Sequence, residues 1–415
     1  MHKNFINKFI VGNNKDFVFL FGCVFLVLAS YFCDIINLTV LSFLFNSTAL
    51  ILILKKLSES NLFHIMWGIA LVIFGFMPPI LLLLAGENAE LWLLRTLVLA
   101  TVFVVMATRE CDYKGFNKSR WHISIQSAWY FCIFAFLVMI ITSGLSFLFL
   151  SPVIIFVTAK AIGRAGKMSF FIFIATYILY FIFYIVFYWD GFGRLILAAM
   201  LIPMYFIVAH ERNWRFSKYF VILSALFIGM LASLNRLKNA NSLVHAIMND
   251  STVLPYILAI DIEKSTNLEM INLSGWLDQV LLFFFASFPR DLWPAKPLGF
   301  GRQYVIDELD IAFLDNGYSI ASLFVGEHIY YLGYFWIFGV FLTLFGLVSI
   351  FKYFHKLDNN SGIWGVMVCL WVPTYFWGGI ASFSSRFQIG LMVTIMIIFL
   401  RFLVVRRRKL NLSLN

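Results

Sequence analysis

The sequence predicts an all-α integral membrane protein with about twelve transmembrane helices and one large extracytoplasmic loop. The chain has 415 residues, of which 62% are hydrophobic and 13% charged, whereas soluble domains are roughly half apolar and a quarter charged. Apolar runs of bilayer-spanning length recur from residue 17 to residue 404. These runs lack the period-two alternation of barrel strands, and lipid permits only helices or closed barrels. The fold class is therefore helical.

Nine spans are predicted before the loop and three after it. They are 17–33, 36–54, 62–85, 91–107, 126–142, 145–159, 169–188, 194–209 and 219–234, followed by 328–351, 363–380 and 388–404. The stretch 126–159 is too long for one crossing, and Thr142-Ser143-Gly144 offers a turn within it. No small-residue cleavage motif follows the first apolar run, so we expect that run to be retained as a span.

These boundaries divide the chain into three parts. Residues 1–234 form an N-terminal membrane domain, 235–327 form the loop, and 328–415 form a C-terminal membrane segment with a basic tail. The loop is not disordered by composition, because it contains tryptophans and aliphatic runs. Its segment Gln279–Phe288 is too short to span. It could lie in the membrane interface, re-enter the membrane or pack on the helices, and Ser274 is its expected N-cap.

The distribution of basic residues predicts that both termini are cytoplasmic. Alternate connections hold about 21 of the 31 lysines and arginines, whereas the short turns on the other side hold only Arg194 and Arg386. Cytoplasmic loops of membrane proteins carry such an excess. The net charge of +10 is thereby explained. No basic stretch is interleaved with exposed aromatics as in a nucleic-acid groove, so we expect no nucleic-acid partner.

Several kinds of chemistry are excluded by missing motifs. The sequence has no phosphate-binding loop, no kinase motifs, no HExxH and no GxSxG. The five cysteines have no metal-ligand spacing, which argues against a structural zinc site or a disulfide framework. They are Cys23, Cys33, Cys111, Cys132 and Cys369. We therefore predict neither a metal nor a cofactor.

The strongest local pattern lies in the loop, where three prolines in ten residues fix a rigid path over 288–297. This path presents Arg290 and Lys296 directly after an apolar segment, close to the membrane surface. Arg302 follows two glycines that let the backbone approach an anion. Arginine binds phosphate in a bidentate manner, so the pattern predicts a site for the diphosphate of a lipid headgroup. The alternative is that Arg290 and Lys296 reach lipid phosphates or pair with Asp291.

Two further arginines and one acid–histidine pair are candidates. Arg194 ends a repeat of the letters Gly-Phe-Gly-Arg, and Arg386 lies in another outer turn. Both are diphosphate-binding candidates, with chance recurrence and a topological anchor as the alternatives. Glu327 and His328 open an apolar span, where polar groups are costly and need a partner or a purpose. Either could act as a general base, and either could be structural.

The motif Phe288-Pro289-Arg290, with Trp293-Pro294, Lys296-Pro297, Gly326-Glu327 and Tyr330-Tyr331-Leu332-Gly333, resembles the Wzy-type O-antigen (oligosaccharide repeat-unit) polymerases. The layout of spans around a large periplasmic loop is also similar to that family and to the related O-antigen ligases.

The resemblance implies a membrane glycosyltransferase of GT-C-like architecture in the bacterial inner membrane. Its substrate would be oligosaccharide linked to undecaprenyl diphosphate, joined at the periplasmic face, with a chain-length regulator as a possible partner. Arg290, with Lys296 or Arg302, would stabilise the leaving diphosphate, and Glu327 or His328 would take the proton of the acceptor hydroxyl. No metal ion is required by this chemistry.

Three rival functions remain open at this point. A flippase would move the same lipid-linked unit, but its charges should line a cavity inside the spans, which here are nearly free of charge. An O-antigen ligase would use the same donor with a different acceptor. A transporter or acyltransferase without a sugar substrate is the third.

Overall fold

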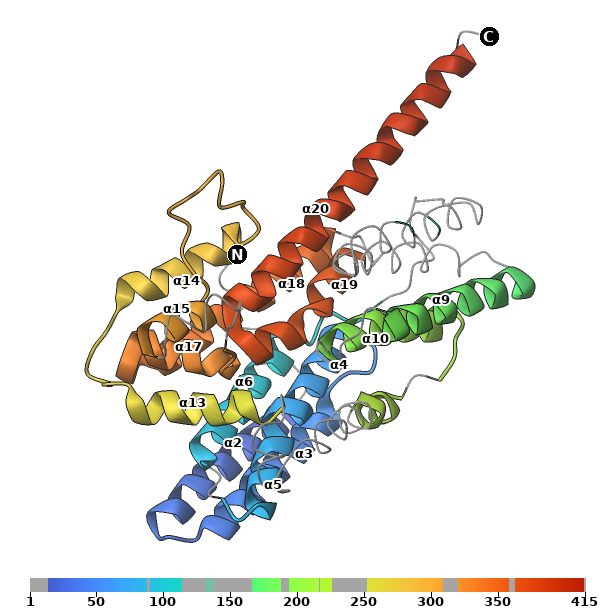
Figure 1. Ribbon diagram of the computed structural model, residues 1–415. Helices are drawn as coiled ribbons and strands as arrows, with labels where there is room; N and C mark the ends of the chain where they lie inside the picture. The colour runs from blue at the N-terminus through green and yellow to red at the C-terminus, as the bar shows by residue number, and fades with distance from the viewer. Residues whose placement is uncertain are drawn as a thin grey trace.

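The computed structural model describes residues 14–87, 90–113, 133, 137, 166–187, 194–215, 217–225, 252–308, 320–357 and 363–413. All regular structure in these ranges is helical, which confirms the all-α prediction. Figure 1 shows helices from both halves of the chain packed together, with the C-terminal helix extending away from the others.

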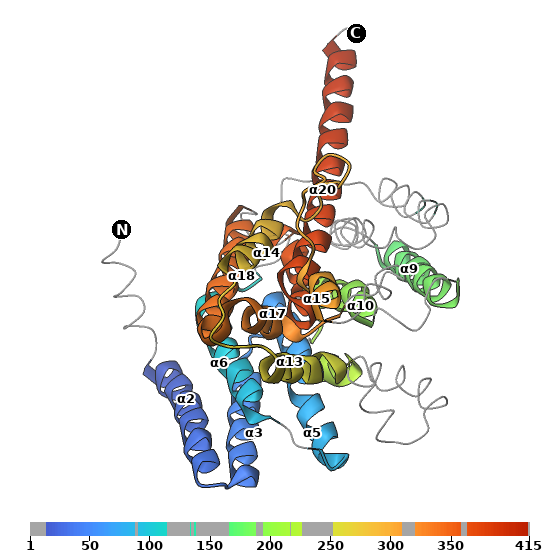
Figure 2. The same cartoon turned by 60° about the vertical axis from the view of Figure 1, so that its left-hand side comes forward.

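The first four predicted spans are helices within a few residues of their expected ends. α2 (Asn14–Ile35) and α3 (Thr39–Lys56) form a hairpin, visible in Figure 2. The third span is α4 (Leu62–Ala70), a π-helical segment (Leu71–Phe76) and α5 (Met77–Leu84) in succession. Pro78 and Pro79 lack backbone N–H groups at the start of α5, which accounts for the loosened turn before it. α6 (Leu91–Thr108) contacts both the hairpin and the C-terminal helices.

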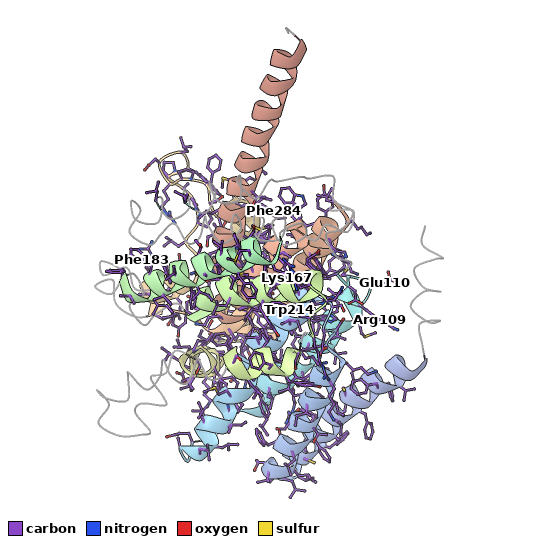
Figure 3. The ribbon with its side chains drawn as sticks, turned by 90° about the vertical axis from the view of Figure 1, so that its right-hand side faces the viewer. Arg109, Glu110, Lys167, Phe183, Trp214 and Phe284 are labelled. Carbon is purple, nitrogen blue, oxygen red and sulfur yellow. The ribbon has the colours of Figure 1, made fainter. Side chains whose placement is uncertain are left out.

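Two helices follow in the middle of the chain, α9 (Lys167–Phe187) and α10 (Arg194–Glu211). Figure 3 shows Lys167 and Phe183 near opposite ends of α9. The segment after α10 returns to the start of α9, where Trp214 packs edge-on against Phe170 at 5.9 Å between ring centroids. The predicted spans 126–142 and 145–159 lie outside the described residues, apart from positions 133 and 137, and most of 219–234 also lies outside them.

The described part of the large loop contains three helices: α13 (Leu254–Ser265), α14 (Leu273–Phe285) and α15 (Phe300–Glu308). α14 packs against α17 (Leu323–Leu332) and against α20 (Val372–Ser413), with Trp276 and Gln279 buried. The segment therefore packs on the helices, and a position in the membrane interface or a re-entrant path stays a prediction. The expected N-cap was wrong: Asn272, not Ser274, accepts the hydrogen bond from the N–H of Gly275.

The predicted span at 328–351 is two helices that fold back on each other, α17 and α18 (Trp336–Leu357). His328 and Thr343 are 3.0 Å apart, whereas residues fifteen positions apart in one straight helix would be separated by about 22 Å. The chain reverses at Gly333, which has φ +50° and lies against the backbone of Leu268. A side chain at this position would be strained and would overlap that backbone.

The last predicted pair of spans is also arranged differently. α19 (Ile363–Leu370) meets α20 at a 75° bend, and α20 itself is broken at Gly378 and Gly379. From Ile380 onward the helix is continuous to Ser413, so the outer turn expected around 381–387 is helical. The reversal occurs at the two glycines, because Gly379 adopts φ +72°.

Five described helical segments are long and apolar enough to cross a membrane, and the bent pair around residue 371 makes a sixth if it is counted as one crossing. The chain is thus a membrane-embedded helical protein, and the structure does not confirm twelve spans or the GT-C fold. The segment Leu323–Leu357 is among the five by length, yet it reverses at Gly333, so only its second helix follows one direction for spanning length.

The C-terminal helices meet α4 in an aromatic core. Trp67 packs against Phe324 and Phe376 with ring centroids 5.9 and 5.2 Å apart, and Phe324 stacks on Tyr375 at 5.3 Å. All four side chains are fully buried. This core fixes α17 and the first part of α20, the two elements that carry the candidate residues next to the break.

Candidate functional site

The proline-rich segment 287–298, here called the cationic loop, is braced by its own two cations. Arg290 donates from its two terminal nitrogens to the carbonyl oxygens of Lys296 and Pro297, at 2.8 and 3.1 Å. Lys296 donates from Nζ to the carbonyl oxygens of Ala286 and Phe288, at 2.5 and 2.9 Å. The two side chains therefore cross the loop in opposite directions and hold it closed.

Enough hydrogen-bond donors remain for a ligand. Guanidinium has five N–H groups and ammonium three, and the two backbone bonds of each side chain leave three free on Arg290 and one on Lys296. Burial, and secondarily the positive charge of Arg290, lowers the pKa of Lys296. Two nearby positive charges repel each other, so the binding of an anion close to both is favourable.

Apolar side chains surround the cationic loop on its exposed side. Phe284 and Phe288 are 63% and 47% exposed, and Leu292 is 72% exposed. Together with Leu277 and Leu281, these side chains form an exposed apolar stripe that runs along one side of α14 to the loop. An exposed apolar stripe that ends in two cations suits an anion carried on a lipid, since the stripe can contact acyl chains while the cations bind the headgroup.

Glu327 is buried at 1% exposure and has a structural partner. Its carboxylate accepts the N–H of Ile380 at 3.0 Å, at the start of the continuous part of α20. A carboxylate at a helix N-terminus satisfies a free N–H and opposes the positive end of the dipole. Glu327 thus caps a helix that begins inside the protein.

His328 has both ring nitrogens engaged and is fully buried. The indole N–H of Trp276 donates to Nδ1 at 2.9 Å, so Nδ1 is the acceptor and the ring carries its proton on Nε2. Nε2 lies 3.0 Å from the hydroxyl of Thr343, which lies 2.9 Å from the hydroxyl of Tyr375. This chain of bonds ties α14, α17, α18 and α20 together around a neutral histidine.

Arg290 makes no described contact with Glu327 or His328. Trp276 of α14 bonds to His328, and Ser287, which follows α14, bonds to Gln388 on α20. At the other end of the cationic loop, Gly299 lies against Ala381, next to Ile380, whose N–H Glu327 accepts. A catalytic centre that combines Arg290 with a base at Glu327 or His328 stays a prediction.

The start of the cationic loop lies near one end of α18. Gln388, which binds Ser287, follows Phe387, whose ring is 5.7 Å from that of Phe354 on α18. The same end of α18 carries Lys352 and Lys356, which are predicted to be cytoplasmic, whereas the loop is predicted to be periplasmic. The position of Arg290 and Lys296 at the outer surface stays a prediction.

The three other predicted arginines are dispersed. Arg302 is exposed on α15, where Gly299 lies directly against Ala381 of α20. Arg386 is partly buried and donates to the carbonyl of Ser382 one turn earlier at 2.7 Å. Arg194 begins α10, and its side chain lies outside the described residues. None of the three makes a described contact with the cationic loop.

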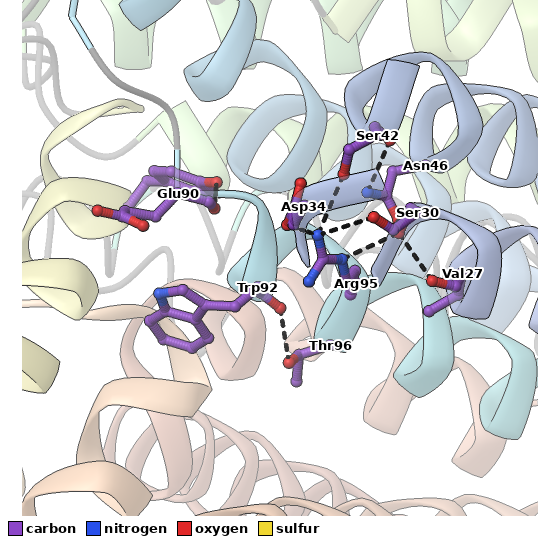
Figure 4. A network of polar contacts seen from close by, with 10 residues as sticks. Val27, Ser30, Asp34, Ser42, Asn46, Glu90, Trp92, Arg95 and Thr96 are labelled. Carbon is purple, nitrogen blue, oxygen red and sulfur yellow. Dashed lines mark hydrogen bonds and ion pairs between the residues drawn. The ribbon is translucent and has the colours of Figure 1, made fainter. Parts of the chain in front are cut away.

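One charged cluster inside the spans was missed by the sequence analysis, which treated the spans as nearly free of charge. Arg95 of α6 pairs with Asp34 at the end of α2 and donates to the hydroxyl groups of Ser30 and Ser42, at 2.9 and 3.1 Å (Figure 4). Ser30 in turn donates to Asn46 at 3.2 Å. Because the charge is paired and surrounded by polar groups, the cluster joins α6 to the α2–α3 hairpin.

Two buried glutamines were also missed, although each interrupts an apolar run and so required partners. Gln279 and Gln388 are 2% and 9% exposed. Each binds one end of the cationic loop through its side-chain amide.

Comparison of the chain with protein-family models, with curated proteins and with solved structures finds no significant match.

Proposed function

We propose that this membrane protein is a glycosyltransferase that polymerises oligosaccharide repeat units carried on undecaprenyl diphosphate, at the periplasmic face of the bacterial inner membrane. The observation that carries the proposal is the cationic loop, a rigid segment that holds Arg290 and Lys296 beside an exposed apolar stripe. The resemblance of its proline-flanked motif to O-antigen polymerases selects the substrate class.

In the proposed reaction, a hydroxyl oxygen of the acceptor sugar attacks the anomeric carbon of the donor. The bond from that carbon to the diphosphate oxygen breaks, and the lipid diphosphate leaves with the bonding electrons. Negative charge thus develops on the diphosphate, where the free N–H groups of Arg290 and Lys296 would stabilise it. Preorganised donors of this kind are worth about 3–4 kcal/mol each in other enzymes.

The acceptor hydroxyl also loses its proton, which in this proposal passes to an oxygen of the departing diphosphate. Glu327 and His328 are buried and bonded within the protein, so we keep only Arg290 and Lys296 as groups that contact the substrate. In the proposal, Glu327 and His328 hold α20 and α14, and through them the loop, in position.

The first test replaces Arg290 by Ala and Lys296 by Met. Each variant is expected to lower polymer length or yield by about 100-fold, because each removes charge stabilisation of the leaving group. The measurement is a gel of the surface polysaccharide from cells that carry each variant. The control is Arg215→Ala, an exposed arginine that is not a site candidate, which is expected to leave the ladder unchanged. Normal ladders in both loop variants, with normal protein levels, would remove the proposal.

The accessible side of the loop provides a second test, since the sugars lie outside the cytoplasm in the proposed reaction. Ala295 is exposed between the two cations, so Ala295→Cys in a cysteine-free background reports directly on the loop. We expect a membrane-impermeant thiol reagent to label it in intact spheroplasts. Labelling only from the cytoplasmic side would contradict a periplasmic polymerase.

A transporter of the lipid-linked unit is the second candidate, and the Arg95–Asp34 cluster is the observation that favours it. Loss of a transporter would abolish even a single ligated repeat unit on the surface. Loss of a polymerase would leave that single unit in place, so a gel from a strain lacking the gene separates the two functions.

A further inference from the structure

The cationic loop is attached to the helices at both ends by side-chain amides, and these attachments are not part of the loop motif itself. At its start, the N–H and the hydroxyl of Ser287 both donate to Oε1 of Gln388, each at 2.8 Å. The amide nitrogen of the same glutamine donates to the carbonyl of Phe283 at 2.8 Å. Gln388 therefore binds the last turn of α14 and the first residue of the loop at once.

At the other end, Gln279 has the same function. Its Oε1 accepts the N–H of Phe300 at 2.9 Å, and its amide nitrogen donates to the carbonyl of Leu298 at 3.0 Å. The bonds involve the residues on either side of Gly299, whose backbone lies against Ala381. The chain is thus fixed where it leaves the loop and enters α15.

Neither glutamine has an alternative partner in water, because both are almost fully buried. A primary amide offers an acceptor and donors at a fixed geometry, which lets one side chain bind two backbone groups. Buried polar groups of this kind are costly unless they are fully paired. The bonds are therefore expected to be maintained whenever the helices are folded.

We infer that Gln279 and Gln388 are positioning residues that hold the cationic loop in its anion-binding conformation. The brace formed by Arg290 and Lys296 alone closes the loop on itself but does not attach it to α20. Gln388 supplies that attachment, and Gln279 attaches the other end of the loop to α14. The inference rests on the proposed function only for the nature of the ligand, a diphosphate-bearing lipid.

Limited proteolysis measures the loop without using the reaction. Trypsin can cleave the bond between Arg290 and Asp291. The bond after Lys296 resists cleavage because Pro297 follows it. In the purified full-length protein, we expect Gln388→Leu and Gln279→Leu to increase the rate of cleavage after Arg290 at least about tenfold. Ser287→Ala, which removes one of the two bonds to Gln388, should give an intermediate rate.

Gln303→Leu is the matched control, because Gln303 donates only to the exposed carboxylate of Asp307 in the next turn of α15. Its cleavage rate should equal that of the parent protein. A thermal unfolding midpoint close to that of the parent identifies which loop variants remain folded. Parent-like cleavage after Arg290 in a folded Gln388→Leu variant and a folded Gln279→Leu variant would overturn the inference.

Binding of inorganic diphosphate, followed through the fluorescence of Trp293 in the loop, separates this inference from the proposed function. We expect the glutamine variants to bind the anion about tenfold more weakly than the parent protein does. If the parent protein binds no diphosphate, the proposed function fails, while the proteolysis result still decides the role of the glutamines. If diphosphate binds to the glutamine variants as tightly as to the parent protein, the inferred positioning role of the glutamines is wrong.

Discussion

At the scale of single residues, substitutions at Glu327 distinguish a helix-capping role from a general-base role. Glu327→Gln keeps an oxygen that can accept the N–H of Ile380, so its stability and its polymer ladder should remain close to those of the parent. Glu327→Ala leaves a buried N–H unpaired and should cost about 1–3 kcal/mol of unfolding free energy. The thermal unfolding midpoint and the polysaccharide gel are compared for both variants. A stable Glu327→Gln variant without polymer would restore the general-base assignment.

The same residues show how much of the site the sequence can predict. Glu327 and His328 were predicted as candidates because polar groups in apolar helices are costly, and the structure does place both in the buried core. Applied to Gln279 and Gln388, the same argument would have found them. Their partners could not be predicted, because Gln388 contacts Ser287 across 101 residues and Glu327 contacts Ile380 across 53. Such contacts depend on the packing of helices, which apolar periodicity does not specify.

At the scale of elements, the break in α20 should depend on one glycine. Gly379→Ala would place a methyl group on the carboxylate of Glu327 at a φ of +72°, so we expect a lower unfolding midpoint and poor recovery in detergent. Gly346→Ala in α18 is the control, since no atom lies within 4 Å of the added methyl group. There we expect no loss, and a gain of up to about 1 kcal/mol from helix propensity. Equal midpoints for both variants would contradict a required break.

The element boundaries were well predicted where polar or basic residues mark the ends of an apolar run. The predicted spans 36–54 and 91–107 correspond to α3 and α6 within three residues at each end. Prediction failed for α17–α18 and for α20, because the chain breaks at glycines within apolar stretches, at Gly333 and at Gly378 and Gly379. Gly333 turns the chain only in the presence of the backbone of Leu268, a contact that no local pattern encodes.

At the scale of the whole molecule, the connections predicted to be cytoplasmic gather together. Nζ of Lys218 donates to the carbonyls of Lys55 and Leu57, and the hydroxyl of Tyr113 donates to Glu211, each within 2.8 Å. The connections predicted to be periplasmic form a separate group, in which Lys264 of α13 pairs with Glu90 at 2.9 Å. These contacts join loops that the charge distribution assigns to the same side, and the orientation of the two sides stays a prediction.

This grouping predicts which side of the membrane each end faces. Lys264 and Lys356 are exposed at the two ends, so Lys264→Cys and Lys356→Cys can be compared in a background without the five native cysteines. In intact spheroplasts we expect an impermeant thiol reagent to label position 264 and to reach position 356 only after the membrane is opened. The reverse pattern would invert the topology. If the reagent labelled both positions in intact spheroplasts, α18 would not cross the full bilayer. The reversal at Gly333 would then lie at a different depth in the membrane.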